Sequence, residues 1–180
     1  MVKSYNDYDK EIGWDTIEKG IDKICRYLEA EAFIPDLMIC VPGAGLIITE
    51  LTKISMGLEL IPTYSLVLQP KGITSLLNKS LNTFEASGWK FTIPQSVYEE
   101  KRSKILVIDD FARTGDTLFY FRKELLSAGI QLENIKIISL ISRKGILEEK
   151  EPDYTVFWEE TYKIGMPWGN ISKIERVKNK

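Results

Sequence analysis

Residues 104 to 118 read KILVIDDFARTGDTL, and the rest of the chain is arranged around them. Ile105 to Ile108 form an uninterrupted run of β-branched residues and leucine, which predicts a strand buried on both faces, as in a parallel sheet. Asp109 and Asp110 follow this run directly. Open α/β sheets bind ligands at the carboxyl ends of their strands, so two acids at this point indicate a binding site.

The residues after the two acids favour an anion. Arg113 to Thr117 supply small, hydroxylated and glycine positions just before a helix that we expect to begin near Leu118. Free N–H groups and the positive end of the helix dipole attract negative charge there. Three interpretations are open at this stage: the Mg²⁺ pocket of a phosphoacceptor receiver domain, carboxylates that cap a turn, and a site for a phosphorylated sugar. A receiver domain carries its acids on the first strand, whereas this pair lies beyond residue 100.

Composition narrows the class of protein. With 180 residues, 44% of them apolar, the chain can bury one sizeable core, so we expect one domain over residues 1–180. A net charge of -2 argues against a nucleic-acid or anionic-membrane binder, and no segment is long and apolar enough for a signal region or a membrane span. Two cysteines do not form a disulfide framework, so we expect a cytoplasmic setting. The chain has no histidine, which leaves carboxylates, lysine, arginine and the backbone for any chemistry.

Hydrophobic periodicity predicts a doubly wound α/β domain with a mainly parallel sheet flanked by helices and a small C-terminal hood. Residues 70–88 read as a long polar loop. The turn Pro42-Gly43-Ala44-Gly45 is compatible with a dinucleotide-binding turn, or simply with a glycine that needs positive φ. We expect helices over 14–32, 46–56 and from 118 to Gly129, and strands over 37–41, 58–69, 89–98, 105–108, 135–141 and 154–158.

The sequence IDDFARTGDTL resembles the phosphoribosyl pyrophosphate (PRPP) signature of the type I phosphoribosyltransferases: an apolar strand, two acids, four variable residues and Thr-Gly-x-Thr. The resemblance covers most of the chain, because GWDTIEKGIDKI, PDLMICVPGAGL and EPDYTVFWEETYKIGMPWG are similar to segments of the xanthine-guanine and hypoxanthine members. It implies the fold of that family and Mg²⁺-dependent transfer of the 5-phosphoribosyl group to a purine-like nucleobase, with release of pyrophosphate, as in purine salvage.

The resemblance also implies roles for individual residues. The acids Asp109 and Asp110 would contact the ribose hydroxyls and hold Mg²⁺, directly or through water, and with Arg113 they would form the catalytic group. A mobile loop over 70–88 would close on PRPP, and a hood over 159–170 would cover the base. The 5′-phosphate would lie on Ala112, Arg113, Thr114, Gly115, Asp116 and Thr117, the pyrophosphate on Gly43, Ala44 and Gly45, and the base on Arg143, Tyr162, Lys163, Ile164 and Trp168. A homodimer is a further expectation.

Four positions depart from the xanthine-guanine pattern, all around the base and the pyrophosphate. Gly43 replaces a cation in the pyrophosphate loop, Arg113 replaces an acid that handles the N7 proton of 6-oxopurines, Lys163 replaces a stacking aromatic residue, and Gly169 replaces an acid. The ribose-phosphate signature is intact. Two functions follow, an enzyme that uses an unusual base and a regulator that senses PRPP or a nucleotide without turnover. Lys71, Lys79 and Lys90 are candidates for a loop cation that reaches the pyrophosphate, or are simply solvated. Arg143 also has a simpler interpretation as a solvated residue, and Trp168 as a packing residue.

Overall fold

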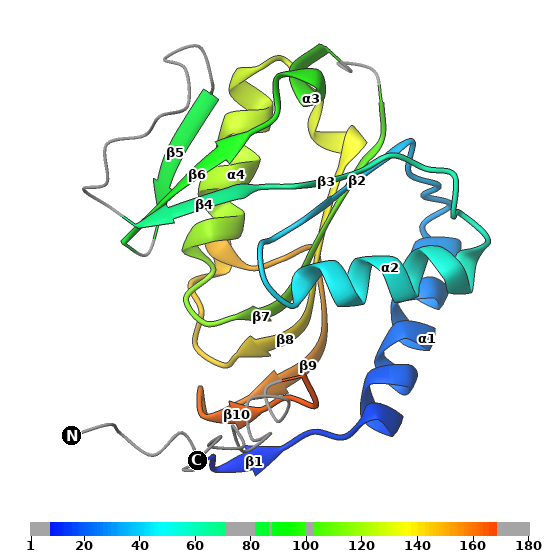
Figure 1. Ribbon diagram of the computed structural model, residues 1–180, viewed down its shortest axis with the longest axis vertical. Coiled ribbons are helices and arrows are strands. Elements are labelled where there is room, and N and C mark those ends of the chain that lie inside the picture. Colours follow the sequence, from blue (N-terminus) through cyan, green and yellow to red (C-terminus); the bar gives the residue numbers. More distant parts are fainter. Residues whose placement is uncertain (1–7, 71–81, 87, 100–102, 169–180) are drawn as a thin grey trace, which may run out of the picture.

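The computed structural model describes residues 8–70, 82–86, 88–99 and 103–168. Its central feature is a five-stranded sheet with the order β3-β2-β7-β8-β9, in which every neighbouring pair is parallel (Figure 1). This confirms the predicted doubly wound α/β class. The elements are β1 (Lys10–Glu11), α1 (Trp14–Ala30), β2 (Leu37–Cys40), α2 (Gly45–Met56), β3 (Thr63–Ser65), β4 (Val67–Pro70), β5 (Asn82–Ala86), β6 (Trp89–Ile93), α3 (Gln95–Glu99), β7 (Ile105–Ala112), α4 (Asp116–Ser127), η1 (Leu132–Asn134), β8 (Ile135–Arg143), η2 (Glu148–Lys150), β9 (Tyr154–Glu159) and β10 (Ile164–Gly165).

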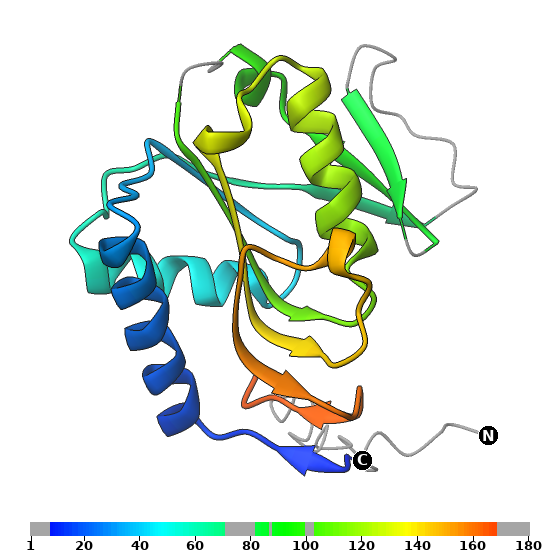
Figure 2. The same cartoon turned by 180° about the vertical axis from the view of Figure 1, so that it is seen from behind.

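Helices cover both faces of the sheet. Helices α1 and α2 lie on one face and α4 lies on the other, as the two opposite views show (Figures 1 and 2). The middle strand β7 contributes to both layers: Ile105 and Val107 pack in the cluster that contains the α4 side chains, and Leu106 and Ile108 pack in the cluster of α1 and α2. All four side chains are fully buried. The prediction of a strand buried on both faces is confirmed. The packing of β7 fixes the position of the acids and the loop that follow its apolar run.

Strand β7 is longer than its apolar run. We expected it to end at Ile108, but it continues through both acids to Ala112, because Phe111 and Ala112 pair with Ile141 and Ser142 of β8. Strand β2 ends earlier, since its last pair with β7 joins Cys40 and Ile108. The two acids therefore lie beyond the end of β2, on a part of β7 that has a neighbouring strand on one side only.

A second, smaller sheet replaces part of the expected loop. Strands β4, β6 and β5 form an antiparallel sheet, and stacking of Phe84 on Phe91 and its contact with Phe121 pack that sheet against α4. Two predictions are corrected here. Part of the polar loop over 70–88 is strand β5, and the strand expected over 89–98 ends at Ile93, because Pro94 interrupts the ladder and a short helix follows. Pro70 belongs to strand β4, and residues 71–81 and 87, with Lys71 and Lys79, lie outside the described residues.

The hood region joins the two ends of the described chain. Strand β10 pairs in parallel with β1, with Lys10 opposite Ile164 and Glu11 opposite Gly165. The backbone of Gly165 lies so close to Tyr8 that a Cβ atom would be 2.7 Å from the tyrosine ring. Two residues are too few to show a periodic pattern, so this pairing could not be predicted from the sequence. The described part of the hood ends at Trp168, so Gly169 and the last residues of the expected 159–170 segment lie outside it.

Two further expectations concern the protein as a whole. Within the described ranges, no helix has the length and apolar character needed to cross a membrane. Cys25 and Cys40 are both buried and both free, which confirms that they are not a disulfide framework.

Candidate active site

The acid pair lies at the carboxyl end of β7, beside the start of α2. The side chain of Asp109 is buried and that of Asp110 is partly buried. Gly45, the first residue of α2, makes this arrangement possible: a Cβ atom there would lie 3.0 Å from the carbonyl oxygen of Ile108 and 3.6 Å from Cα of Asp109. The absence of a side chain thus lets the turn at the end of β2 approach the acids closely.

Burial changes how the acids ionise. Loss of water and the neighbouring Asp110 carboxylate raise the pKa of Asp109 to about 8. Burial also raises the pKa of Asp110, while a hydrogen bond from Asp109 opposes the rise. Two acids in contact cannot both ionise cheaply, so the pair tends to retain a proton that the two carboxyl groups share. A bound cation, or a ligand whose hydroxyl groups donate hydrogen bonds to the carboxylates, would reduce the repulsion between the two acids.

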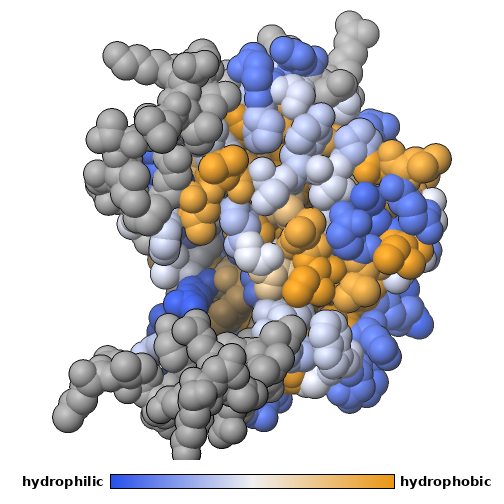
Figure 3. Space-filling view, viewed as in Figure 1, coloured by the Kyte–Doolittle hydropathy of each residue, from blue (hydrophilic) through white to orange (hydrophobic). Residues whose placement is uncertain are grey.

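A small cavity follows the acids. It has a volume of about 150 Å³ and is lined by Asp109 and a continuous loop, residues 112–118, that leads into α4. Gly115 precedes the helix with φ of +74°, a left-handed conformation that favours glycine. Helix α4 begins at Asp116, two residues before the expected start near Leu118. Figure 3 shows the surface hollowed at its left side, where β7 ends in Figure 1.

Lys150 supports this loop from behind, and sequence reasoning missed it. Its Nζ atom donates to Oδ1 of Asp116 at 2.9 Å, while the other oxygen of Asp116 accepts from the Thr114 hydroxyl at 3.0 Å. A Cβ atom on Gly115 would lie 2.3 Å from the carbonyl oxygen of Lys150, so the loop packs directly on η2. The ammonium lowers the pKa of Asp116. Nothing in the sequence signals a contact across 34 residues, which depends on the path between β8 and β9.

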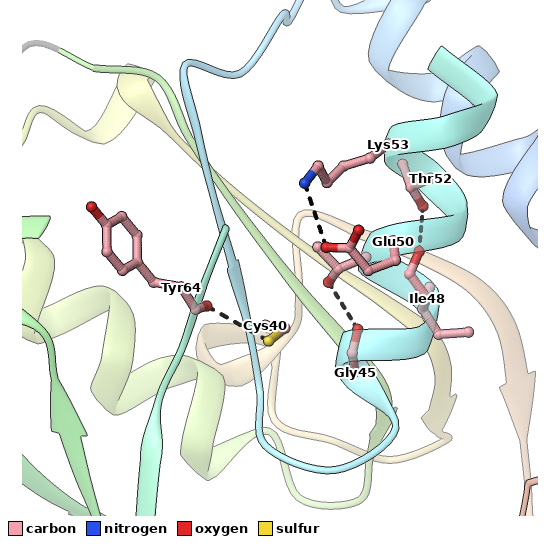
Figure 4. A network of polar contacts seen from close by, with 8 residues as sticks. Cys40, Gly45, Ile48, Glu50, Thr52, Lys53 and Tyr64 are labelled. Carbon is pink, nitrogen blue, oxygen red and sulfur yellow. Dashed lines mark hydrogen bonds and ion pairs between the residues drawn. The ribbon is translucent and has the colours of Figure 1, made fainter. Parts of the chain in front are cut away.

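The turn between β2 and α2 faces the acids from the other side. Gly43 is exposed, with φ of +108°, which confirms the interpretation of a turn that needs positive φ. The first turns of α2 satisfy their own polar groups, because the hydroxyls of Thr49 and Thr52 donate to the carbonyl oxygens of Gly45 and Ile48, both at 2.8 Å (Figure 4). These two hydroxyls are therefore already bonded within α2.

A larger cavity, of about 390 Å³, lies between α1 and α2, and we do not assign the active site to it. Its cysteine, Cys25, is a buried thiol whose pKa is raised by burial, which makes it a poor nucleophile. The cavity contains neither the acid pair nor the start of a helix. Its lining residues are Glu18, Ile21, Asp22, Cys25, Arg26, Glu29, Leu51 and Ser55.

Comparison with known proteins settles the fold. No family model and no curated protein matches the chain. A purine phosphoribosyltransferase from Pyrococcus horikoshii matches in structure with 23% identity and a TM-score of 0.62, covering 88% of this chain and 92% of that one. The xanthine-guanine-hypoxanthine phosphoribosyltransferase of Helicobacter pylori matches with 18% identity and a TM-score of 0.64, covering 91% and 95%. The chain has the fold of the type I phosphoribosyltransferases. A protein from Neisseria gonorrhoeae with bound ppGpp is also similar, with 18% identity, a TM-score of 0.59, and 88% and 89% of the two chains covered.

In this phosphoribosyltransferase fold, the residues expected at the base lie in different environments. Arg143 is exposed at the end of β8 and Tyr162 is exposed in the hood, whereas Ile164 is buried in β10 and Lys163 is partly buried. Trp168 packs edge-on against Trp14, with ring centroids 6.0 Å apart. The structure therefore gives Ile164 and Trp168 clear packing roles, and leaves Arg143 and Tyr162 free to meet a ligand.

Arg113 lies close to the acid pair, Asp109 and Asp110. Its guanidinium lies 5.8 Å above the ring of Phe111 and its charge lowers the pKa of Asp110, although burial outweighs this effect. Lys90 lies within strand β6 of the small sheet. The structure thus brings together the predicted ribose, phosphate and pyrophosphate residues around the end of β7.

Proposed function

We propose that the protein is a phosphoribosyltransferase, which transfers the 5-phosphoribosyl group of PRPP to a ring nitrogen of a nucleobase and releases pyrophosphate. One observation carries the proposal: a buried acid pair stands directly beside a glycine-containing loop that opens a helix, on the fold of the type I phosphoribosyltransferases. A phosphorylated sugar needs both features, hydroxyl acceptors and an anion cradle, a few residues apart.

The loop before α4 is the proposed cradle for the 5′-phosphate. Its cavity lies at the amino end of a twelve-residue helix, where unpaired N–H groups and the helix dipole favour an anion. Asp116 is not a direct phosphate ligand in this proposal, because both of its oxygens already accept hydrogen bonds, from Lys150 and Thr114. It fixes the loop instead, and the backbone of Arg113 to Thr117 holds the phosphate.

Asp109 and Asp110 are proposed to hold the ribose and Mg²⁺. Magnesium is bound in proteins through one or two carboxylates, with water and substrate phosphates as the other ligands, and a buried acid pair next to a phosphate cradle fits that donor set. The described residues contain no group of three or more metal-binding side chains, so substrate oxygens would complete the coordination. When bound, Mg²⁺ offsets the charge on the pyrophosphate.

The remaining protein groups orient the reaction. The turn at Gly43, Ala44 and Gly45 offers backbone N–H groups to the pyrophosphate, next to Asp109. Cleavage of the bond between C1′ and the pyrophosphate builds positive charge on the ribose, so the acids also stand where a negative charge is useful. Holding the sugar, the leaving group and the incoming nitrogen in line supplies the main rate advantage.

A second function is a regulator that binds PRPP or a nucleotide without turnover. Two observations favour it: Gly43 and Arg113 stand where the xanthine-guanine pattern has a cation and an acid, and a protein of this fold from Neisseria gonorrhoeae has ppGpp bound. Both functions need the same ribose-phosphate site, so they differ in turnover and not in binding.

Two measurements test the proposal. Calorimetry with PRPP and Mg²⁺ should detect binding that Asp110→Asn and Thr114→Ala weaken by about tenfold or more, since the first removes a charge from the ribose and Mg²⁺ site and the second removes the hydroxyl that bonds Asp116 and fixes the phosphate loop. Pyrophosphate release should then be followed over a panel of purines, pyrimidines and analogues. Turnover with any base supports the enzyme, and tight binding without turnover supports the regulator. If neither PRPP nor a nucleoside monophosphate binds, both functions are refuted.

A further inference from the structure

Two arginines stand side by side at the base end of the proposed site. Arg113 follows β7 and Arg143 ends β8, each one residue beyond the paired residues Ala112 and Ser142. Neighbouring strands of a parallel sheet are about 4.8 Å apart, and paired residues project from the same face. Both arginines are exposed.

The two arginines also share a face of the sheet. The guanidinium of Arg113 lies 5.8 Å above the ring of Phe111, and Phe111 is paired with Ile141. Ile141 lies two residues before Arg143 on the same strand, so their side chains project from the same face. Phe111 and Ile141 pack in the cluster that includes Trp168 of the hood. Both cations therefore border the space between the strand ends and the hood.

Two acids at and just after the end of β9 are paired with other cations. Glu159 is paired with Lys10 at 2.5 Å, and Glu160 with Lys144 at 2.8 Å. Among the described residues, no carboxylate lies within ion-pair distance of Arg113 or Arg143; only the charge of Asp110 is felt at Arg113, and that acid belongs to the ribose end. Within the described ranges, Arg143 therefore has no ion-pair partner, and Arg113 has only the longer-range attraction of Asp110.

We propose that the acceptor is a nitrogen heterocycle that carries a planar anionic group, a ring carboxylate, which the Arg143 and Arg113 guanidinium groups bind. This inference rests on the proposed function and narrows its substrate class. A guanidinium presents a flat fork of N–H donors that matches a carboxylate with two parallel hydrogen bonds. A neutral base would offer these guanidinium groups no charged partner.

The same residues limit how the nitrogen can react. An arginine has no acceptor and stays protonated, so Arg113 cannot take a proton from the attacking ring nitrogen. The acceptor must therefore attack with a free lone pair: a bond forms between this nitrogen and C1′, the bond between C1′ and the pyrophosphate oxygen breaks, and its electron pair leaves with the pyrophosphate. A proton on the ring nitrogen, where there is one, is lost to water before the attack.

Matched pairs of compounds test the inference: nicotinate with nicotinamide, orotate with its carboxamide, and purine-6-carboxylate with its carboxamide. Each pair differs only in the charge of one planar group. Using the PRPP-loaded protein, we expect at least one carboxylate to bind about ten- to a hundredfold more tightly than its amide, and to react faster if there is turnover. Amides that bind as well as their carboxylates in all three pairs would overturn the inference.

Variants of the adjacent cations sharpen the test. Arg143→Gln should reduce the preference for the carboxylate by about tenfold and leave PRPP affinity unchanged, and Arg143→Lys should restore only part of it because the planar fork is lost. Lys144→Gln is the matched control, a neighbouring exposed cation already paired with Glu160, and should change neither quantity. Loss of preference in the control as well would also refute the inference, since general charge would then explain it. Absence of PRPP binding would refute the proposed function itself, so the two failures are distinguishable.

Discussion

Replacing Asp109 with asparagine should stabilise the fold at neutral pH while removing ligand binding. The carboxyl of Asp109 is buried beside Asp110, and its pKa rises from 3.8 to about 8 on folding. An acid whose pKa is raised in the folded state opposes folding once it is ionised in the unfolded chain. Wild-type stability should therefore fall as the pH rises from about 4 to about 8, and asparagine, which has the same shape and no charge, should not show this loss.

The structure sets the size of the effect. One pKa unit corresponds to about 1.4 kcal/mol, and roughly three units separate the unfolded pKa from pH 7, so the ceiling is about 4 kcal/mol. Water and the Asp110 side chain rearrange around the new charge and offset part of it. We therefore expect Asp109→Asn to raise the free energy of unfolding by about 1 to 3 kcal/mol at pH 7 and by less at pH 5.

Urea unfolding at pH 5, 6, 7 and 8 measures the effect directly. The chain contains no histidine, so no imidazole titrates in this range and the pH dependence comes mainly from perturbed acids. Asp15→Asn is the control, because Asp15 is an exposed acid in the first turn of α1 and its loss should change stability by about 0.5 kcal/mol or less at every pH. If the stability curves of the wild type and of Asp109→Asn run parallel from pH 5 to pH 8, the argument for a strained acid pair is wrong.

Three other changes probe the loop and the base end. Lys150→Met, which removes the cation that holds Asp116, should weaken ribose 5-phosphate binding about tenfold by calorimetry, whereas Lys144→Met should not; equal affinities would remove Lys150 from the site. Gly115→Ala should cost at least about 3 kcal/mol in urea unfolding, because its Cβ meets the Lys150 carbonyl at 2.3 Å. Gly145→Ala shares the positive φ but has no neighbour within 4 Å, so it should cost only about 1 to 2 kcal/mol; similar costs would contradict the packing argument. Arg113→Asp should raise any activity on hypoxanthine or guanine, and no gain at unchanged PRPP affinity would show that Arg113 is not what excludes these bases.

The part of the fold that sequence predicted best is the part with continuous apolar runs. Strands β7 and β8 were recognised because a strand buried on both faces needs nearly every residue to be apolar. The end of β7 was misplaced for the same reason, since the acids break the run while the backbone ladder continues to Ala112. Strand β5 was missed because its pairing with β6 depends on partners and not on its own polar sequence.

The site residues also fall into two groups, those that a local motif predicts and those that depend on contacts between distant segments. A local motif was enough to place the acids and the loop up to Thr117, since strand, turn and helix follow one another within a few residues. Lys150 could not be found this way. Its contact with Asp116 joins residues 34 positions apart, and it exists only because the segment between β8 and β9 folds back under the loop.

Arg113 and Arg143 show that the contacts between distant segments matter most for the proposed function. In sequence, each is singled out separately: Arg113 replaces an acid of the xanthine-guanine pattern, and Arg143 is either a base contact or a solvated residue at a strand end. The register of β7 and β8 turns them into a pair, because Ala112 lies opposite Ser142 and both arginines come next. The pairing of Glu159 with Lys10 then depends on the end of β9 lying next to the first strand of the described chain. The charge that we propose to select the acceptor is therefore a property of three strand ends together, and no single segment of the sequence carries it.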